Sequence, residues 1–233
     1  MARKPDLQTL FPVTAVDLAG DGGWYTLTLT QVAEAAKSDL STLRAHYVSK
    51  DALLTGFGAY VDRRVLFELD PEPDAMARDR LFDVLMTRFD VLNDHRAGVL
   101  AILEDLRQDP IGAAMQILPF ERSMSWMLEA AGIETRGLRG RLKVRVLGVL
   151  YLDVLRAWKK DDSPDMAATM KVLDERLSQA EQLANTFEMV RPAPAEDAAR
   201  EAEAAEPEPS GDDTSSADGS PGTGTPGDTK ATG

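Results

Sequence analysis

Helical periodicity constrains this chain more than any other feature of its sequence. From about residue 6 to residue 190, apolar side chains recur at intervals of three and four residues rather than in strict alternation. Only the segment 24–29 has the aromatic and threonine content of a strand, and a lone strand would have no partner, so we expect a loop there. The sequence therefore predicts an all-α fold.

Glycine and proline residues divide the helical region into two domains. The glycine-rich run 20–23 should end a first helix, and the run Asp70-Pro71-Glu72-Pro73 should end the last helix of a small N-terminal domain. The helices expected in this domain cover residues 7–19, 29–36, 40–47 and 49–69. We therefore predict an N-terminal domain over residues 6–69 and a helical-bundle C-terminal domain over residues 74–190.

Longer amphipathic helices should build the C-terminal domain. They are expected over residues 74–93, 95–107, 110–131, 135–160 and 166–190. Pro119 should kink or split the third of these helices, and Gly132 should end it. Ser163 and Pro164 should begin the last helix as its N-cap and first residue. His95, at the start of a helix, is expected on the surface.

The end of the chain differs in composition from the rest. Residues 191–233 carry ten acidic and three basic side chains and no aromatic residue. Such a segment cannot bury enough apolar surface to offset the entropy of ordering, so we predict a disordered acidic tail. The tail supplies seven of the 13 net negative charges, whereas residues 1–66 carry seven acidic and seven basic side chains. The overall acidity therefore does not exclude a nucleic acid as the partner of the N-terminal domain.

The composition also argues against several classes of function. There is no cysteine, and two histidines are too few for a structural zinc site. Adjacent carboxylates such as Glu104-Asp105 do not share a helix face, and no Ser-His-Asp set or glycine-rich phosphate loop occurs. No apolar run is long enough to span a membrane. We therefore expect a cytoplasmic protein without membrane insertion, with no enzymatic activity and no metal or other cofactor.

Residues 28–54 have the pattern of a helix-turn-helix. The small residues Ala33 and Ala36 fall where two helices would cross, and Val32, Leu43 and Tyr47 are spaced to form a small core with them. The second helix would present a short, mostly polar face to the DNA major groove through Asp39, Ser41, Thr42, Ala45 and His46. The residues expected to contact phosphates are Thr28, Lys37, Arg44 and Lys50. His46 could contact phosphate or cap the end of its short helix.

At this segment the sequence resembles the TetR-type transcriptional regulators. Their N-terminal signature has a threonine that opens the second helix, an alanine-rich crossing, a Thr-Leu-Tyr-x-His-Phe run and then Ser-Lys-Glu-x-Leu. The corresponding residues here are Thr28, Ala33, Ala36, Thr42-Leu43-Arg44-Ala45-His46-Tyr47 and Ser49-Lys50-Asp51-Ala52-Leu53. The resemblance covers about residues 10–56. It implies a three-helix DNA-binding domain that binds a double-stranded DNA operator, and it adds Tyr47 to the expected interface.

The sequence departs from the signature at four positions of the motif. Lys37 stands at the usual glycine of the turn, Ser38 at a buried valine, and Leu40 at the basic residue that begins the recognition helix. Arg44 stands at a tyrosine that contacts phosphate, and its charge can make a stronger phosphate contact. Leu40 cannot replace the contact of a basic residue.

The resemblance also implies roles for the C-terminal domain. A ligand-responsive repressor of this type would bind a small apolar effector in the helical domain and would form a homodimer through its last two long helices, here 135–160 and 166–190. The residues expected to line the effector pocket are Phe82, Met86, Phe89, Met124 and Met127, although a plain hydrophobic core would explain each of them as well. The basic residues at 136, 139, 141, 143 and 145 suggest a solvated face or a site for an acidic segment.

A second, shorter resemblance suggests an alternative function. Residues 22–24, 158–165 and 169–177 resemble parts of the lipid-binding accessory protein of ubiquinone biosynthesis, which has a TetR-like fold without DNA binding. That protein uses an amphipathic C-terminal helix at membranes. Here the corresponding end is acidic, and anionic lipid would repel it.

Overall fold

The computed structural model describes residues 6–69 and 74–189, with side chains up to residue 184. Within these ranges all regular structure is helical, as predicted. The helices are α1 (Leu7–Gly22), α2 (Leu29–Ala35), α3 (Leu40–His46), α4 (Lys50–Glu68), α5 (Ala77–Asn93), α6 (Arg96–Gln108), α7 (Pro110–Met115), α8 (Ile117–Ala130), α9 (Gly137–Trp158) and α10 (Ala167–Met189). The residues of the predicted tail lie outside the described part of the chain.

Side-chain caps fix the first residues of the four N-terminal helices. The side chains of Asp6, Thr28, Asp39 and Ser49 each accept a hydrogen bond from a backbone N–H in the first turn of α1, α2, α3 and α4. Each of these bonds satisfies a donor that the helix itself cannot pair. The strand-like segment 24–29 is indeed a loop up to the cap of α2.

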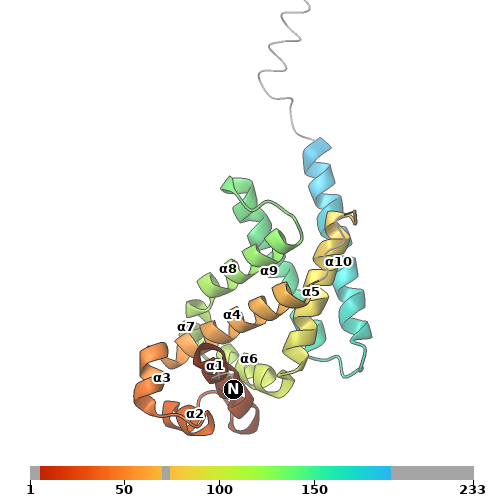
Figure 1. The fold of residues 1–233 in the computed structure, drawn as a ribbon. Coiled ribbons are helices and arrows are strands. Elements are labelled where there is room, and N and C mark those ends of the chain that lie inside the picture. Colours follow the sequence, from red (N-terminus) through yellow and green to blue (C-terminus); the bar gives the residue numbers. More distant parts are fainter. Residues whose placement is uncertain (1–5, 70–73, 190–233) are drawn as a thin grey trace, which may run out of the picture. The chain divides into compact units, whose positions relative to one another are not determined.

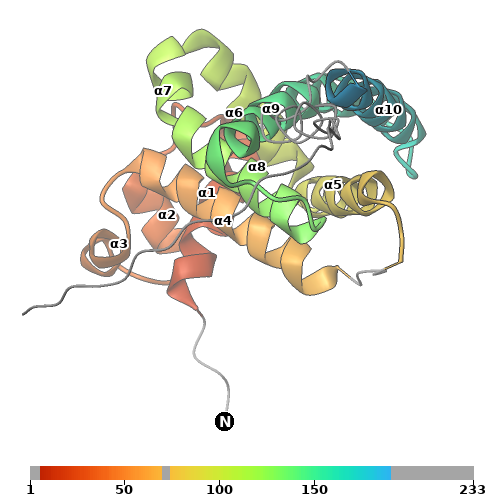
Figure 2. The ribbon, with the colours of Figure 1, turned by 90° about the horizontal axis from the view of Figure 1, so that it is seen from above.

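The helix α4 joins the N-terminal helices to the rest of the molecule. Its buried side chains Leu53, Phe57, Val61 and Val65 follow the helical period, and α4 contacts α1, α5 and α8. In Figures 1 and 2, α2 and α3 lie at one end of residues 6–189 and α10 lies at the other. The predicted boundary at residues 70–73 falls outside the described residues.

The pairing of α1 with α6 depends on glycine. A Cβ atom on Gly98 of α6 would lie 2.0 Å from the backbone oxygen of Val16 in α1, and one on Gly20 would lie 3.0 Å from the backbone nitrogen of Gly98. The two helices therefore approach each other closely only because these side chains are missing. The pairing also covers His95, so the expectation of a surface position was wrong. Its side chain is 11% exposed, with Nδ1 2.7 Å from Oδ1 of Asp17.

Two expectations about helix ends can be compared with the structure. The predicted split of the segment 110–131 is confirmed, and it falls at Gln116, so that Pro119 lies in the first turn of α8, where its missing N–H leaves no bond unmade. The last helix does not begin at Pro164, which was wrong. It begins at Ala167, because Met166 has a φ of 51°, outside the helical region. The Ser163 hydroxyl accepts a bond of 3.1 Å from the N–H of Ala167, and the Asp161 carboxylate accepts bonds of 2.7 Å from the N–H and the hydroxyl of Thr169.

A buried ion pair joins α4 to the C-terminal helices. The guanidinium of Arg88 in α5 is paired with the carboxylate of Asp62 in α4, and its Nε donates to the Tyr151 hydroxyl of α9 at 3.2 Å. The Ser123 hydroxyl of α8 also donates to Asp62, at 2.5 Å. Arg88 is only 6% exposed. Four helices therefore meet at one charged pair inside an apolar core. Among the described helices, none is both long and apolar enough to cross a membrane.

Candidate nucleic-acid interface

The helices α2 and α3 form the predicted helix-turn-helix. Val32, Ala33, Ala36 and Leu43 are buried between them, and Tyr47 packs against the same core. The small alanines allow α2 and α3 to cross closely. The predicted core of the motif is therefore confirmed.

The turn between α2 and α3 has a left-handed backbone at Lys37, where glycine would be the usual residue. Lys37 has a φ of 53°, in the left-handed region that glycine adopts most readily. The N–H of Ser38 donates to the Ala33 carbonyl at 2.9 Å and closes the turn. The Lys37 side chain is exposed, so this strained position presents a positive charge to solvent.

Two of the predicted interface residues, Asp39 and Thr42, bond to each other in the cap of α3. The Asp39 carboxylate accepts bonds of 2.9 Å from both the backbone N–H and the hydroxyl of Thr42. These two bonds lower the pKa of Asp39 below its ordinary value, so the cap stays ionised. Thr42 is half-buried. The Asp39–Thr42 pair therefore stabilises the start of the recognition helix, and these groups are not free to form hydrogen bonds with bases.

The outward face of α3 consists of four residues. Leu40, Ser41, Arg44 and Ala45 are all exposed, and the helical period places them side by side. His46 is exposed at the end of the helix, with its ring 6.1 Å from that of Phe11. Thr28 is also exposed, although its hydroxyl donates to the Gln31 side chain within the capping box of α2. The structure therefore leaves Lys37, Ser41 and Arg44 exposed, with Ser41 and Arg44 on the outward face of α3.

Two side chains predicted to contact DNA, those of Lys50 and Tyr47, are bonded within the protein instead. The ammonium of Lys50 donates to the carbonyl oxygens of Trp24 and Leu27, the latter at 2.8 Å, and lies 5.0 Å from the centre of the Trp24 ring. Burial lowers the pKa of Lys50. The Tyr47 hydroxyl donates to the Gln8 carbonyl of α1. Both side chains hold the N-terminal helices together and do not extend from the exposed face of α3.

A further anchor of this region was not anticipated from the sequence. The Asp105 carboxylate of α6 accepts a bond of 3.0 Å from the N–H of Tyr25, and the Tyr25 hydroxyl donates to the Asp105 carbonyl at 3.1 Å. Lys50 and Asp105 thus hold the loop that precedes α2 from two sides. A pair of residues so far apart in sequence leaves no local signal that could have revealed the contact.

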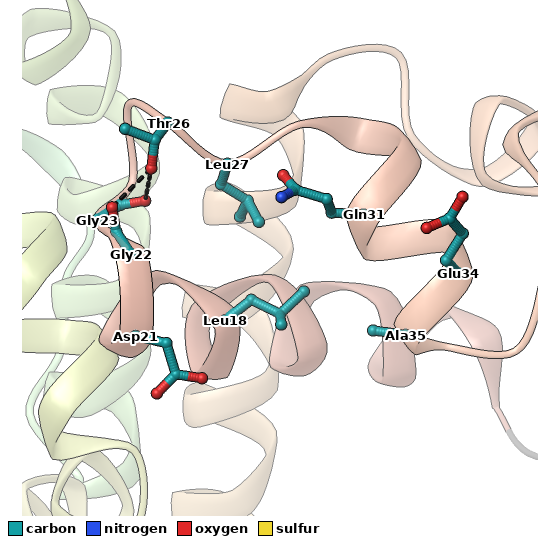
Figure 3. A pocket seen from close by; sticks show the side chains of 9 residues that line it. All are labelled: Leu18, Asp21, Gly22, Gly23, Thr26, Leu27, Gln31, Glu34 and Ala35. Carbon is teal, nitrogen blue, oxygen red and sulfur yellow. Dashed lines mark hydrogen bonds between the residues drawn. The ribbon is translucent and has the colours of Figure 1, made fainter.

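A surface hollow of about 410 Å³ lies between α1 and α2. Figure 3 shows Leu18 and Asp21 of α1 on one side and Gln31, Glu34 and Ala35 of α2 on the other. The carboxylates of Asp21 and Glu34 on its rim would repel phosphate. None of the five residues predicted to line an effector pocket lies in this hollow.

Those five residues come together in the C-terminal core instead. Phe89, Met124 and Met127 are fully buried, and Phe82 and Met86 pack against the same core. The ring of Phe89 stacks on Tyr151 with centroids 5.1 Å apart, and the sulfur of Met127 lies 3.9 Å from Nη1 of Arg88. The predicted pocket residues therefore belong to the packed core, and Met127 among them lies against the buried ion pair.

The residues that carry the resemblance to a lipid-binding protein have local structural tasks. Trp158 is fully buried, with the guanidinium of Arg96 stacked 4.5 Å from its ring centre. Asp161 caps the start of α10 through Thr169. These contacts give Trp158, Asp161 and Thr169 roles in the packing of the fold.

Comparisons with known proteins agree with this fold. No protein-family model and no curated protein matches the sequence. Among solved structures, a TetR transcriptional regulator from Nitrosomonas europaea is similar, with a TM-score of 0.63 and 23% identity over 76% of this chain and 99% of that one. A TetR-family transcriptional regulator from Streptomyces coelicolor has a TM-score of 0.53 and 16% identity over 88% of this chain and 92% of that one. The described part of the chain therefore has the fold of the TetR-family transcriptional regulators.

Proposed function

We propose that the protein is a TetR-like DNA-binding transcriptional regulator, a ligand-responsive repressor that acts as a homodimer. Residues 6–69 would be its DNA-binding domain. The observation that carries the proposal is the exposed outer face of α3 beside the cationic turn at Lys37, on a fold that solved TetR regulators share. An exposed helix of this size fits the major groove, which is about 12 Å wide.

The proposed contacts with DNA follow from which side chains are exposed and which are already bonded within the protein. Lys37 and Arg44 would bind phosphates, because both are exposed cations, one in the turn before the recognition helix and one on its outward face. Ser41 would face the bases, with Thr42 and His46 at the edge of the contact. Lys50, Tyr47 and Asp39 would support the interface through the hydrogen bonds that they make within the N-terminal helices.

A salt titration tests this assignment. We expect Lys37→Gly to weaken binding to the protein's own upstream DNA and to reduce the slope of log affinity against log salt by about one, as removal of one phosphate contact should. Glycine suits the left-handed turn, so the variant keeps or improves folding stability. Arg44→Ala should act in the same direction. Fluorescence anisotropy with labelled duplexes gives both quantities.

Lys171→Ala on the exposed side of α10 serves as the charge-matched control and should leave the slope unchanged. The proposal is refuted if the wild-type protein shows no binding to this DNA even at low salt. It is weakened if the control and Lys37→Gly behave alike.

The proposed homodimer is supported by an exposed apolar stripe on α9. Leu138, Leu142 and Val149 lie on one side of the helix and are 85%, 62% and 71% exposed. The N-terminal half of α9 is rich in arginine and lysine, whereas α10 exposes Asp174, Glu175 and Glu181. In a two-fold arrangement α9 of one protomer can therefore meet α10 of the other with complementary charge.

Substitution in the stripe tests the dimer. We expect Leu142→Glu to convert a wild-type dimer to a monomer in light scattering after size exclusion, because each two-fold contact would bury two unpaired carboxylates. The control Ile111→Glu, at an apolar side chain of α7 that is 75% exposed, should remain dimeric. A wild-type protein that is monomeric at micromolar concentration would contradict the proposed dimer.

The proposed effector site lies among Phe82, Met86, Phe89, Met124 and Met127. Methionine side chains adapt to irregular shapes, so this core can open around an apolar molecule. The Asp62–Arg88 pair, which Met127 contacts, would connect such an opening to α4, which carries Asp62. Native mass spectrometry of the purified protein tests for a retained ligand, and a bound isoprenoid without DNA binding would favour the lipid-carrier alternative.

A further inference from the structure

The first residue of the recognition helix is an exposed leucine. Leu40 is 48% exposed, and it shares the outward face of α3 with Ser41, Arg44 and Ala45. Single exposed leucines are common on protein surfaces. The place of Leu40 matters here, because this face would enter the major groove if the proposed function holds.

Few groups on this face can form hydrogen bonds with base edges. Asp39 has both carboxylate oxygens bonded to Thr42, whose hydroxyl proton is used in the same pair. Arg44 is a long cation suited to phosphate. Ser41 is then the one short hydroxyl on the face whose bonds are not committed within the cap. Recognition by hydrogen bonds alone would leave Leu40 and Ala45 without a favourable contact.

The major groove offers one apolar group, the C5 methyl of thymine. Cytosine, guanine and adenine present donors and acceptors that an aliphatic side chain would desolvate without replacement. Leu40 and Ala45 are five residues apart, about 1.4 helical turns, and lie at the two edges of the exposed face, so each can meet a different base pair of one half-site.

We infer that the recognition helix selects half-sites with thymine methyl groups opposite Leu40 and Ala45. The inference rests on the proposed DNA-binding function and defines what that function recognises. Leu40 is then a specificity-determining residue, and hydrophobic contact replaces part of the attraction that a basic residue would supply. Because an apolar base contact releases no counterions, the contacts of Leu40 and Ala45 should add affinity without increasing the salt dependence of binding.

The test compares thymine with deoxyuridine, which lacks only the methyl group. A site is first selected from a random-sequence duplex pool with the full-length protein. Thymines in each half-site are then replaced singly by deoxyuridine, and affinity is measured by fluorescence anisotropy. Replacement of a contacted thymine should weaken binding about fourfold, as expected for one methyl group removed from an apolar contact.

Leu40→Ala provides the matched protein variant. Its affinity for the thymine site should be lower than that of the wild type by about fourfold or more. Replacement of the thymine that faces residue 40 by deoxyuridine should then cause little further loss of affinity. Ala45 would still respond to its own thymine in this variant. Because Leu40 is exposed, the variant should keep wild-type helicity in circular dichroism, which excludes misfolding as the cause.

The possible results separate the two claims. Equal affinity for thymine and deoxyuridine at every half-site position, with wild-type DNA binding intact, overturns this inference alone. A selected site without thymine in its half-sites does the same. Failure to enrich any sequence even at low salt overturns the proposed function and the inference with it.

Discussion

At the scale of single residues, Arg88 and Asp62 form an ion pair that is buried in the core. The guanidinium is almost completely buried and is satisfied by Asp62 and Tyr151. We expect Asp62→Ala to lower the free energy of unfolding by about 3–5 kcal/mol, because it leaves a buried charge without its partner. Urea denaturation followed by circular dichroism measures the loss.

The double variant Asp62→Leu with Arg88→Met is the control for this prediction. Replacement of both charges by apolar groups should recover most of the lost stability. A single variant within about 1 kcal/mol of the wild type would mean that water reaches Arg88 and that the core around it is open to solvent.

Residue roles were predictable from the sequence only where they are local. Thr28 was expected to open the second helix of the motif, and its side chain caps α2, since a cap depends on residues two or three positions away. Lys50 was expected at phosphate and instead binds carbonyl oxygens in a loop 23 to 26 residues earlier. Arg88 lies on the apolar stripe of its helix, between Leu85 and Leu92, and a charge at such a position was the one signal of the buried pair.

At the scale of elements, the contact between α1 and α6 can be tested with a pair of glycines. Gly98→Ala should reduce the free energy of unfolding by at least about 2 kcal/mol, because its Cβ would meet the Val16 carbonyl and force the two helices apart. A Cβ on Gly58 of α4 would have no neighbouring atom within 4 Å, so Gly58→Ala should be neutral or stabilising by up to about 1 kcal/mol. Equal effects of the two substitutions in thermal unfolding would contradict the close pairing.

The start of α10 gives a pH dependence. Burial raises the pKa of Asp161, but bonds from Ser163 and Thr169 outweigh it and hold the pKa well below its ordinary value of 3.8. The carboxylate therefore stabilises the fold at neutral pH, and this contribution is lost as the pH falls below 3.8 toward the folded-state pKa. We expect Asp161→Ala to cost about 1–2 kcal/mol near neutral pH and less in acid.

Asp162→Ala, at the neighbouring exposed position, is the control and should have a small effect at every pH. A deficit of Asp161→Ala that stayed constant down to the acid transition would argue against an ionised cap. The order of the helices was predictable from the sequence, but the first residue of α10 was not. Ser163 and Pro164 have the sequence of a helix start, but the carboxylate of Asp161 reaches past them to Thr169.

At the scale of the whole molecule, the uneven distribution of charge matters more than the total of −13. Residues 1–66 carry seven acidic and seven basic side chains, whereas the proposed DNA-binding domain, residues 6–69, carries eight acidic and five basic ones. The fold class and the place of the helix-turn-helix were predictable because amphipathic periodicity and breakers encode them directly. The long-range bonds of Asp105, His95 and Arg88 were not, since they depend on how the helices are packed.

A footprint on DNA tests the central claim most directly. If two recognition helices of a homodimer bind successive major grooves, hydroxyl-radical cleavage of the selected site should show two protected half-sites about 10 base pairs apart on one face of the duplex. Leu142→Glu, which should abolish the dimer, should remove both at the same protein concentration. Uniform cleavage at low salt and saturating wild-type protein would contradict the proposal that this fold binds DNA.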